Sequence, residues 1–573
     1  MTFRGRVGWL LAAAAAALAF TGAASAHAYL VKTVPQASVV LTAPPPNVQL
    51  TFDEAVEPRF ATISVTDAEA HQQATGPPTR SPTNPDTLIV PLRPHLAEGW
   101  YLVYWRAISV DGHPVQGAFT FAVGPNEGPA PQFVVPKISQ TATTPRLLIA
   151  RWVMFLSVMT AIGLFVLRAI IARPVARRVD GASLRPLSVA FVVASIVGLI
   201  AVPVYLDIST SVDSLRSSFE VGALVPLFRV TAFGRAYVDL AICFGLFCIA
   251  AWIALWLDRP KLEQRSIAGL GAVLGALLAA GACLLIPGTA GHAAQTAPRG
   301  LSLLLDWLHL VSGSIWMGGL IGLLVLWWGL AGNRLAGLRV AVPRFSNTAF
   351  FAVLVLLGSG VGATIIHMPT VASLWQTSYG QAILVKIALL AAAMLVGAVN
   401  LLVTVPRLRA AQSGSEQATR LLRTTVRTEV VLVVSALFAA AVLSSLAPPA
   451  AALAKEGSAL AHVGPGKVAS TVHQNGYTMQ VLVSPNKAVA DNTFALKLTK
   501  NGVPVTGADV TLQFDMLDMQ MTNQEYQLTE TAPGVYSHPA PALVMVGHWG
   551  LSFNVNPKNG EPFTTFIVDH ATG

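Results

Sequence analysis

Three polar residues in the amino-terminal part of the chain have types and spacing that could hold a metal ion. The segment "SVDGHPVQG" contains Asp111 and His113, two positions apart, so both side chains lie on one face if the segment is extended. If a leader is removed after residue 26, His27 becomes the first residue and can chelate a metal ion with its α-amine and imidazole. Two imidazoles, an amine and a carboxylate suit Cu(II). The alternative interpretation of the Asp-Gly-His segment alone is an ordinary turn.

The chelate at His27 depends on the preceding residues, which have the pattern of a targeting segment. Arg4 and Arg6 precede an apolar run over 7–20, and Ala-Ser-Ala at 24–26 resembles a signal-peptidase site. The alternative is an uncleaved anchor helix, although the run is short for a membrane span of roughly 20 residues. We therefore expect residues 1–26 to be a signal peptide.

A second set of ligand-type residues lies near the carboxyl end. In "FDMLDMQMTNQ", Met519 and Met521 share one face of an extended strand, whereas Met516 lies on the other face. Met545 and His548 could approach them from a neighbouring strand. Thioether and imidazole ligands favour Cu(I), so these residues, Met516 excepted, are candidate Cu(I) ligands. The alternative is a methionine-rich core of a β-sandwich.

Four ionisable residues interrupt long apolar segments, where such side chains are costly and often functional: Asp239, Asp306, His309 and Lys386. Asp306 and His309 are three positions apart and share a helix face. A structural ion pair between Asp306 and Lys386 is the alternative to a transport role for those two residues.

All three cysteines also lie in apolar runs, at positions 243, 248 and 283. They could be soft Cu(I) ligands, but they form no CxxC pattern, and buried free cysteine is common.

The composition indicates that these residues are positioned by a membrane protein. Charged residues make up 11% of the 573 positions, against about 25% in soluble domains. Apolar segments of spanning length occur eight times, at about 147–171, 187–206, 234–257, 267–287, 302–330, 345–366, 381–405 and 428–447.

Basic residues are distributed unevenly between the loops. The loops after the first, third, fifth and seventh segments hold fifteen arginines and lysines, and the opposite loops hold four. This asymmetry predicts that the fifteen face the cytoplasm. It accounts for the net charge of +9 without nucleic-acid binding, and it places both polar ends of the chain outside.

The two polar regions have strand patterns. Residues 27–124 and 448–573 contain short alternating or β-branched runs separated by Pro, Gly and Asn, which predicts all-β folds. The expected fold is a multidomain membrane protein with an amino-terminal β-barrel, eight helices over 147–447 and a carboxyl-terminal β-sandwich. A linker over 125–146 joins the first two domains.

The amino-terminal region resembles the CopC copper-binding family. The matching stretches are "HAYLVKTVPQASVVLTAPPPNVQLTFDEAVEPRFATISVTD" and "AEGWYLVYWRAISVDGHPVQGAFTFAVG". The resemblance implies a small β-barrel outside the cell or in the periplasm, with Cu(II) held by His27, Asp111 and His113. Some members also carry a methionine-rich Cu(I) site, which we expect to be absent because no methionine lies between residues 27 and 140.

The membrane region resembles CopD in "GTAGHAAQTAPRGLSLLLDWLHLVSGSIWMGGLIGL" and "SYGQAILVKIALLAAAMLVGAVNLL". This resemblance implies copper movement across the inner membrane. The residues in the matching motif are His292, His309, Trp316, Tyr379, Lys386 and Asn400. Together with Asp306, residues His292, His309 and Lys386 form the expected copper path. The last domain resembles the YtkA/FixH-like domains that follow CopC and CopD in copper importers of the YcnJ type.

The resulting hypothesis is a copper importer of the bacterial inner membrane that is not an enzyme. Its expected partners are copper ions, the lipid bilayer and extracytoplasmic copper chaperones. The alternatives are copper resistance by sequestration, which would use the same residues, and a copper-dependent oxidative enzyme. Asp111 disfavours the enzyme because it would fill a coordination position that oxygen needs. The sequence has no GxxxxGK[ST] motif for direct use of ATP.

Overall fold

The computed structural model describes most of the chain in two compact units. The first holds the membrane-type helices, and the second holds both β-rich regions together with residues 368–381. The described residues are 30–572 apart from 37–38, 53–55, 57, 59–60, 109–113, 126–144, 215–224, 226–230, 297, 331, 369, 411–415, 447–458, 489, 518–523, 541, 545 and 559.

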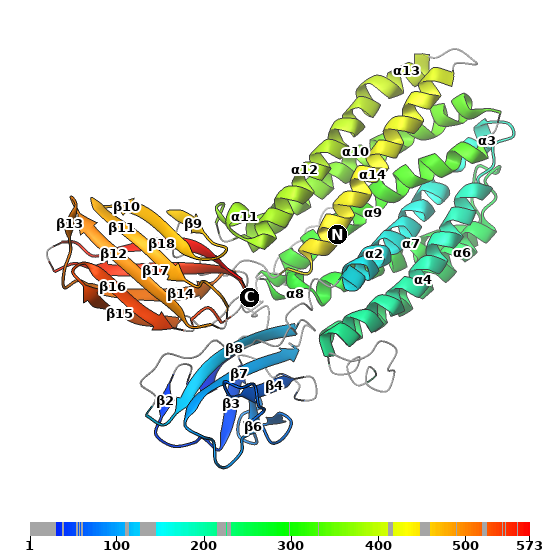
Figure 1. The fold of residues 1–573 in the computed structure, drawn as a ribbon. Helices are drawn as coiled ribbons and strands as arrows, with labels where there is room; N and C mark the ends of the chain where they lie inside the picture. The colour runs from blue at the N-terminus through cyan, green and yellow to red at the C-terminus, as the bar shows by residue number, and fades with distance from the viewer. Residues whose placement is uncertain are drawn as a thin grey trace, which may run out of the picture. The chain divides into compact units, whose positions relative to one another are not determined.

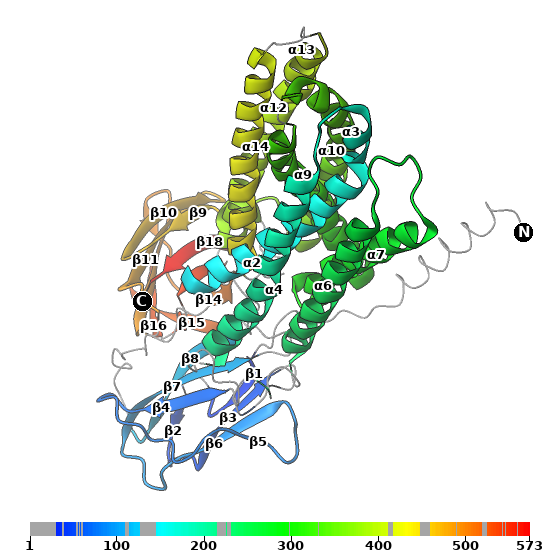
Figure 2. The same cartoon turned by 90° about the vertical axis from the view of Figure 1, so that its right-hand side faces the viewer.

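The amino-terminal domain consists of two four-stranded sheets with a shared core (Figure 1 and Figure 2). One sheet has the order β1-β3-β6-β5 and the other β2-β8-β7-β4. Alternation in β3 sends Val48, Leu50 and Phe52 into the core. The strands are β1 (Leu30–Val34), β2 (Val40–Leu41), β3 (Asn47–Phe52), β4 (Thr62–Thr66), β5 (Thr79–Arg80), β6 (Thr87–Pro91), β7 (Gly99–Ile108) and β8 (Pro114–Val123).

The carboxyl-terminal domain is built from one continuous path of strands. The order is β10-β11-β12-β16-β15-β14-β17-β18-β9, and β13 pairs with β12. Because β15 pairs with both β14 and β16, the two halves of the predicted sandwich are connected. The strands are β9 (Ala461–Val463), β10 (Val468–Gln474), β11 (Tyr477–Ser484), β12 (Asn492–Lys500), β13 (Val503–Pro504), β14 (Asp509–Met516), β15 (Gln524–Ala532), β16 (Val535–Ala540), β17 (Gly547–Asn556) and β18 (Phe563–Ala571).

Eight helices among the described residues are long and apolar enough to cross a membrane, which confirms the predicted number. Two of them continue into short π-helical turns, η3 and η4. The helical elements are α2 (Pro145–Val166), η3 (Leu167–Ile171), α3 (Arg173–Arg178), α4 (Arg185–Ser214), α6 (Ala232–Leu257), α7 (Ile267–Thr289), α8 (His292–Gln295), α9 (Arg299–Gly329), α10 (Arg334–His367), α11 (Ser373–Gln376), α12 (Ser378–Val399), η4 (Asn400–Thr404), α13 (Val405–Ala410) and α14 (Glu416–Leu443).

The centre of the bundle is the close contact between α2 and α9. A Cβ atom built on Gly163 would lie 2.1 Å from the carbonyl oxygen of Ser314, and one on Gly318 would lie 2.6 Å from the Cα of Gly163. Only glycine permits the two backbones to approach this closely, as small residues generally do between membrane helices. The approach brings α9, which carries Asp306 and His309, into the middle of the helices.

Hydrogen bonds show that the four arginine-rich loops gather at one end of the bundle. Arg173 donates to the Glu263 carbonyl at 2.9 Å, and Asn333 donates to the Asp180 carbonyl at 2.8 Å. Arg339 donates to the Leu408 carbonyl at 2.9 Å, which adds the loop after the seventh span.

The opposite end of the bundle contains both connections to the β-rich regions. Near the start of α2, Arg151 donates to the carbonyl of Ala441 in the last turn of α14 at 3.3 Å and to Ser444 Oγ just after this helix at 3.1 Å. The chain therefore enters and leaves the bundle at the end without the arginine-rich loops.

Candidate functional site

The predicted amino-terminal copper ligands, His27, Asp111 and His113, are not among the residues that the structure describes. His27 precedes β1 by three positions, and Asp111 and His113 fall between the paired strands β7 and β8. The same is true of three candidate Cu(I) ligands in the last domain, Met519, Met521 and Met545. These assignments remain predictions.

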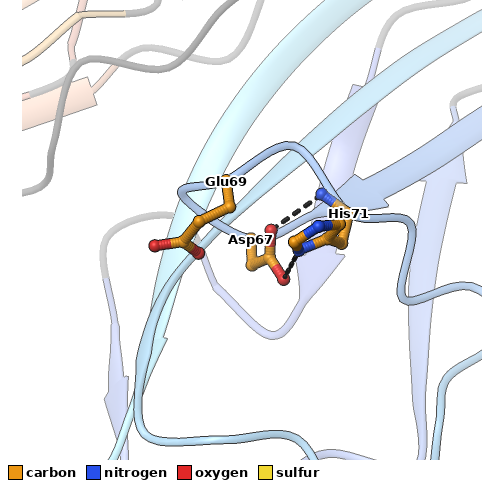
Figure 3. Close-up of side chains that lie close together, drawn as sticks. All are labelled: Asp67, Glu69 and His71. Carbon is orange, nitrogen blue, oxygen red and sulfur yellow. Dashed lines mark hydrogen bonds and ion pairs between the residues drawn. The ribbon is translucent and has the colours of Figure 1, made fainter.

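One group in the described part of the chain has metal-ligand spacing: Asp67, Glu69 and His71, after β4 (Figure 3). Its geometry is explained by local hydrogen bonds. Asp67 accepts from the His71 backbone at 2.8 Å and from Gln73 Nε2 at 2.9 Å, and His71 Nδ1 lies 3.3 Å from Asp67 Oδ2. Because the His71 side chain is 74% exposed, this group has the character of a solvated turn.

His309 is the centre of a polar contact between three membrane helices. From α9, its Nδ1 lies 3.2 Å from the Leu356 carbonyl and 3.3 Å from Ser359 Oγ, both on α10. Its Nε2 lies 3.2 Å from Lys386 Nζ on α12. A carbonyl can only accept, so Nδ1 carries the proton and Nε2 accepts from the lysine. Nε2 is also the nitrogen that a metal ion would use.

Asp306 faces a different neighbour from His309. A Cβ on Gly288 would lie 2.6 Å from Asp306 Oδ2, so the carboxylate lies against the end of α7. The ion pairs of the described residues include none between Asp306 and Lys386. The direct ion pair considered for those two residues is therefore not seen among the described residues, and the lysine lies 3.2 Å from His309 Nε2.

Glu429 on α14 is a site residue that sequence reasoning missed. It is 4% exposed, and its two carboxylate oxygens accept from Trp316 Nε1 and Asn400 Nδ2, both at 3.0 Å. Thr425 donates to the Asn400 side-chain oxygen. Trp316 and Asn400 belong to the motif that carries the CopD resemblance, so the structure brings two motif residues together around an acid.

The two polar groups lie at different depths of the bundle. His309 and Trp316 are seven positions apart on α9, which corresponds to about 10 Å along the helix axis. Asn400 begins the π-helical turn η4, and such turns are frequent at functional sites. Polar residues are thus arranged in successive steps through an apolar bundle.

The remaining candidates are less closely associated with these groups. His292, predicted in a loop, begins the short helix α8. Tyr379 is buried near the start of α12. Cys243 and Cys248 are half-buried on α6, and Cys283 is buried on α7.

In the last domain, the described candidate ligand is His548 on β17. It pairs directly with His570 of β18, and the two rings stack with centroids 4.7 Å apart. Met516 is 4% exposed and packs in the main core of the domain. Burial, followed by the positive charge of a protonated His548, lowers the pKa of nearby His462.

Comparison with known families finds a match within each of the three regions. Residues 30–124 match the CopC domain, residues 339–443 match copper resistance protein D, and residues 471–553 match the YtkA-like family. The chain therefore contains a CopC, a CopD and a YtkA-like domain in this order. Its C-terminal YtkA-like domain completes the predicted order, so the recognised family and fold class are confirmed.

Individual relatives cover either the whole CopC–CopD chain or its first domain. Copper transport protein CutJ of Bacillus subtilis (strain 168) is 27% identical over 548 residues, covering 93% of this chain and 95% of CutJ. Protein YobA of Escherichia coli (strain K12) is 39% identical over 98 residues, covering 17% of this chain and 79% of YobA. The structure of CopC from Methylosinus trichosporium OB3b, 34% identical, matches 18% of this chain and 98% of its own with a TM-score of 0.16.

Proposed function

We propose that this CopC–CopD protein imports copper across the bacterial inner membrane. The outer domain captures Cu(II), and the helix bundle passes copper inward past His309 and Glu429. The observation that carries the proposal is the contact of His309 with Lys386 inside a bundle of eight apolar helices. Its relative CutJ bears the name of a copper transport protein.

Capture at the outer domain would use His27, Asp111 and His113. The free amine and imidazole of a processed His27 occupy two positions around the ion, and the Asp-Gly-His segment supplies the other two. This nitrogen and oxygen set suits Cu(II), and each nitrogen must lose its proton before it binds. Capture is therefore expected to weaken in acid.

Passage through the bundle would depend on Lys386. A copper ion can bind His309 Nε2 only after the Lys386 ammonium has left that nitrogen, because both need the same lone pair. The positive charges of the copper ion and of the Lys386 ammonium also repel each other in a medium of low dielectric constant. Lys386 thus acts as a gate that the arriving ion must displace. Glu429 of α14 accepts a hydrogen bond from Trp316, which lies about 10 Å further along α9, and supplies an anionic oxygen set for the next step.

The orientation that we infer places the arginine-rich loops in the cytoplasm and both β-rich regions outside. The positive-inside rule supports this assignment. The joining of the α2 start and the α14 end through Arg151 also supports it, since both regions then attach at one end of the bundle. The proposed role is that of a carrier rather than an enzyme.

The decisive experiment measures cell copper under copper limitation in a deletion strain that expresses variants of the full chain. His309→Ala is expected to lower cell copper to the level of the deletion strain, with unchanged protein abundance. The control is His367→Ala at the end of α10, whose Nδ1 lies 2.8 Å from the Ala363 carbonyl of its own helix. It is expected to import normally.

Two results would contradict import. One is unchanged or raised copper in the deletion strain, and the other is normal import by His309→Ala. A copper-sensitive deletion strain with normal uptake would favour sequestration instead.

A further inference from the structure

We propose that His462, His548 and His570 form a copper site on the outer face of the carboxyl-terminal domain. The site goes beyond the proposed function, because it requires neither import nor the chelate at His27. It also differs from the predicted Cu(I) site, since its donors are imidazoles from three neighbouring strands.

Strand register places the three histidines on one face. His548 of β17 lies directly opposite His570 of β18, and His462 of β9 lies opposite Val568. Val568 and His570 are two positions apart, so they point to the same side of the sheet. The strands β17, β18 and β9 are consecutive neighbours in the sheet (Figure 1). All three imidazoles therefore project from the same patch.

The opposite face of these strands packs in the core of the domain. Trp549, Ile567 and Ala571 alternate with the histidines and are buried in the main core. Asp569 also points to that side, where its Oδ1 accepts from Asn486 Nδ2 at 2.9 Å. Asp569 nevertheless lines the same pocket as the histidines, so the donor set there is three imidazoles with one carboxylate beside them.

The histidines line a pocket of about 320 Å³ that contains an unsatisfied polar atom. The rest of the lining consists of Val463, Val568 and Asp569 of the same strands and of residues 375, 376 and 381, which belong to the same compact unit. Gln376 is 2% exposed, and its side-chain oxygen has no hydrogen-bond partner among the described residues. A buried acceptor without a donor is rare and costly. A water molecule bound to a metal ion in the pocket would supply that donor.

The surroundings of His548 are those of a metal ligand. Its Nδ1 lies 3.4 Å from Ser378 Oγ, so the proposed bond to the ion is through Nε2. Ligating histidines usually have their second ring nitrogen in such a contact. The rings of His548 and His570 are stacked, with planes 22° apart, so they must turn about their side-chain bonds for their nitrogens to converge on one ion.

Imidazole nitrogens bind zinc, copper, iron and nickel, and copper(II) binds most tightly among the divalent ions of this row. A pocket with three imidazoles and an open position for water fits this ion. Zn(II) accepts the same ligands, and the affinity order alone does not choose the metal of a site. Copper is assigned because the same chain carries the CopC and copper resistance protein D domains.

The test uses the purified full chain in detergent, in a background that carries His27→Ala and His113→Ala. This background removes the proposed amino-terminal chelate, whether or not that chelate exists. Cu(II) binding is measured by competition with a chelator, and imidazole nitrogens are detected by EPR. His462→Asn, His548→Asn and His570→Asn are each expected to lower the affinity about tenfold or more and to change the nitrogen splitting.

The matched control is His473→Asn on β10. This histidine is exposed in the same domain, and its Nδ1 lies 3.0 Å from Thr478 Oγ1. It is expected to leave binding unchanged. Melting curves without metal identify a variant that fails to fold, and the other two histidines then decide the question.

Unchanged Cu(II) affinity in the folded variants would overturn the site, as would an equal loss in His473→Asn. Tighter binding of Zn(II) than of Cu(II) would overturn the assignment to copper. Neither result depends on uptake by cells, so failure of import and failure of this site are separate outcomes.

Discussion

Glu429 illustrates how a single acid can be retained within an apolar bundle. An unpaired carboxylate in this environment costs several kcal/mol, on the order given for buried ions. Here the indole of Trp316 and the amide of Asn400 each donate one hydrogen bond to it. No arginine or lysine neutralises it among the ion pairs of the described residues. In the proposed import, this carboxylate would offer its negative charge to a passing cation.

Replacing Glu429 by Gln tests this role. The substitution preserves shape and one acceptor oxygen but removes the charge, so we expect copper uptake to fall about tenfold, as for loss of roughly 1.4 kcal/mol of interaction with the ion. The melting temperature should change little, because Asn400 can turn its amide so that its oxygen accepts from the new amide and its nitrogen donates to Thr425. Uptake of radioactive copper into cells and melting curves of the purified protein measure the two quantities.

The control for Glu429→Gln is Asp239→Asn. Asp239 is another carboxylate within an apolar helix, but it is exposed on the surface of α6. Its substitution should leave uptake unchanged. Equal uptake by the wild type and Glu429→Gln would assign Glu429 to packing alone.

The sequence could predict Asp306, His309 and Lys386 because each interrupts an apolar run. Glu429 was not predicted because it is the second residue of the apolar segment that begins at 428, next but one to Arg427. An acid at such a position is typical of a membrane surface. The helix α14 begins twelve residues earlier, at Glu416, so Glu429 lies well inside it. Only the packing of α9, η4 and α14 brings its partners together.

Helices and strands were easier to predict from the sequence than the contacts between them. The alternation that places Tyr477, Met479, Val481 and Val483 in the core identifies β11 directly, and runs of apolar residues identify all eight spans. The turns η3 and η4 have no comparable signal, because a π-helical turn depends on neighbouring helices. Likewise, α8 and α11 contain only four residues each, too few for a periodic pattern.

The cluster around Asp258 joins three elements at the arginine-rich end. Its side chain is 1% exposed and lies 2.9 Å from Arg168 of η3 and 3.0 Å from Arg173 of α3. Arg265, which precedes α7, lies 3.5 Å away. Burial alone would raise the pKa of Asp258, but hydrogen bonds from Arg168 and Arg173 outweigh it, so the pKa is lowered.

Asp258→Asn should destabilise the bundle by roughly 3–5 kcal/mol, because it leaves three guanidinium groups without their counter-ion. Melting of the purified protein measures the effect. The control is Glu263→Gln, which breaks the 3.3 Å pair with Arg177; the Glu263 side chain is 83% exposed. Exposed pairs contribute about 0–1 kcal/mol. Equal melting temperatures for both variants would contradict this account.

The same cluster predicts the response to acid. The folded pKa of Asp258 lies below the unfolded value of about 3.9. Its stabilisation is therefore fully present above about pH 4 and is lost as the pH falls through the folded pKa. The difference in stability between the wild type and Asp258→Asn should shrink below that pH.

At the scale of the whole molecule, the ends of the bundle have different chemistry. At one end, side chains of the arginine-rich loops donate hydrogen bonds to backbone carbonyls of neighbouring loops. At the other end, the chain enters α2 and leaves α14, and Arg151 connects these two helices. The polar steps at His309 and Glu429 lie between the two ends. A carrier that captures its ion on one side of the membrane and releases it on the other needs two ends with different chemistry.

The orientation can be tested with single cysteines in a chain whose three native cysteines are replaced. Lys497→Cys in the last domain should react with a membrane-impermeant maleimide on intact spheroplasts. Lys261→Cys, in the loop between α6 and α7, should react only after the membrane is permeabilised. The expectation rests on the distribution of charge, because the loops with more arginine and lysine are retained in the cytoplasm. Labelling of Lys261→Cys on intact spheroplasts would reverse the assignment, and the β-rich regions would then lie where they could not capture copper from outside.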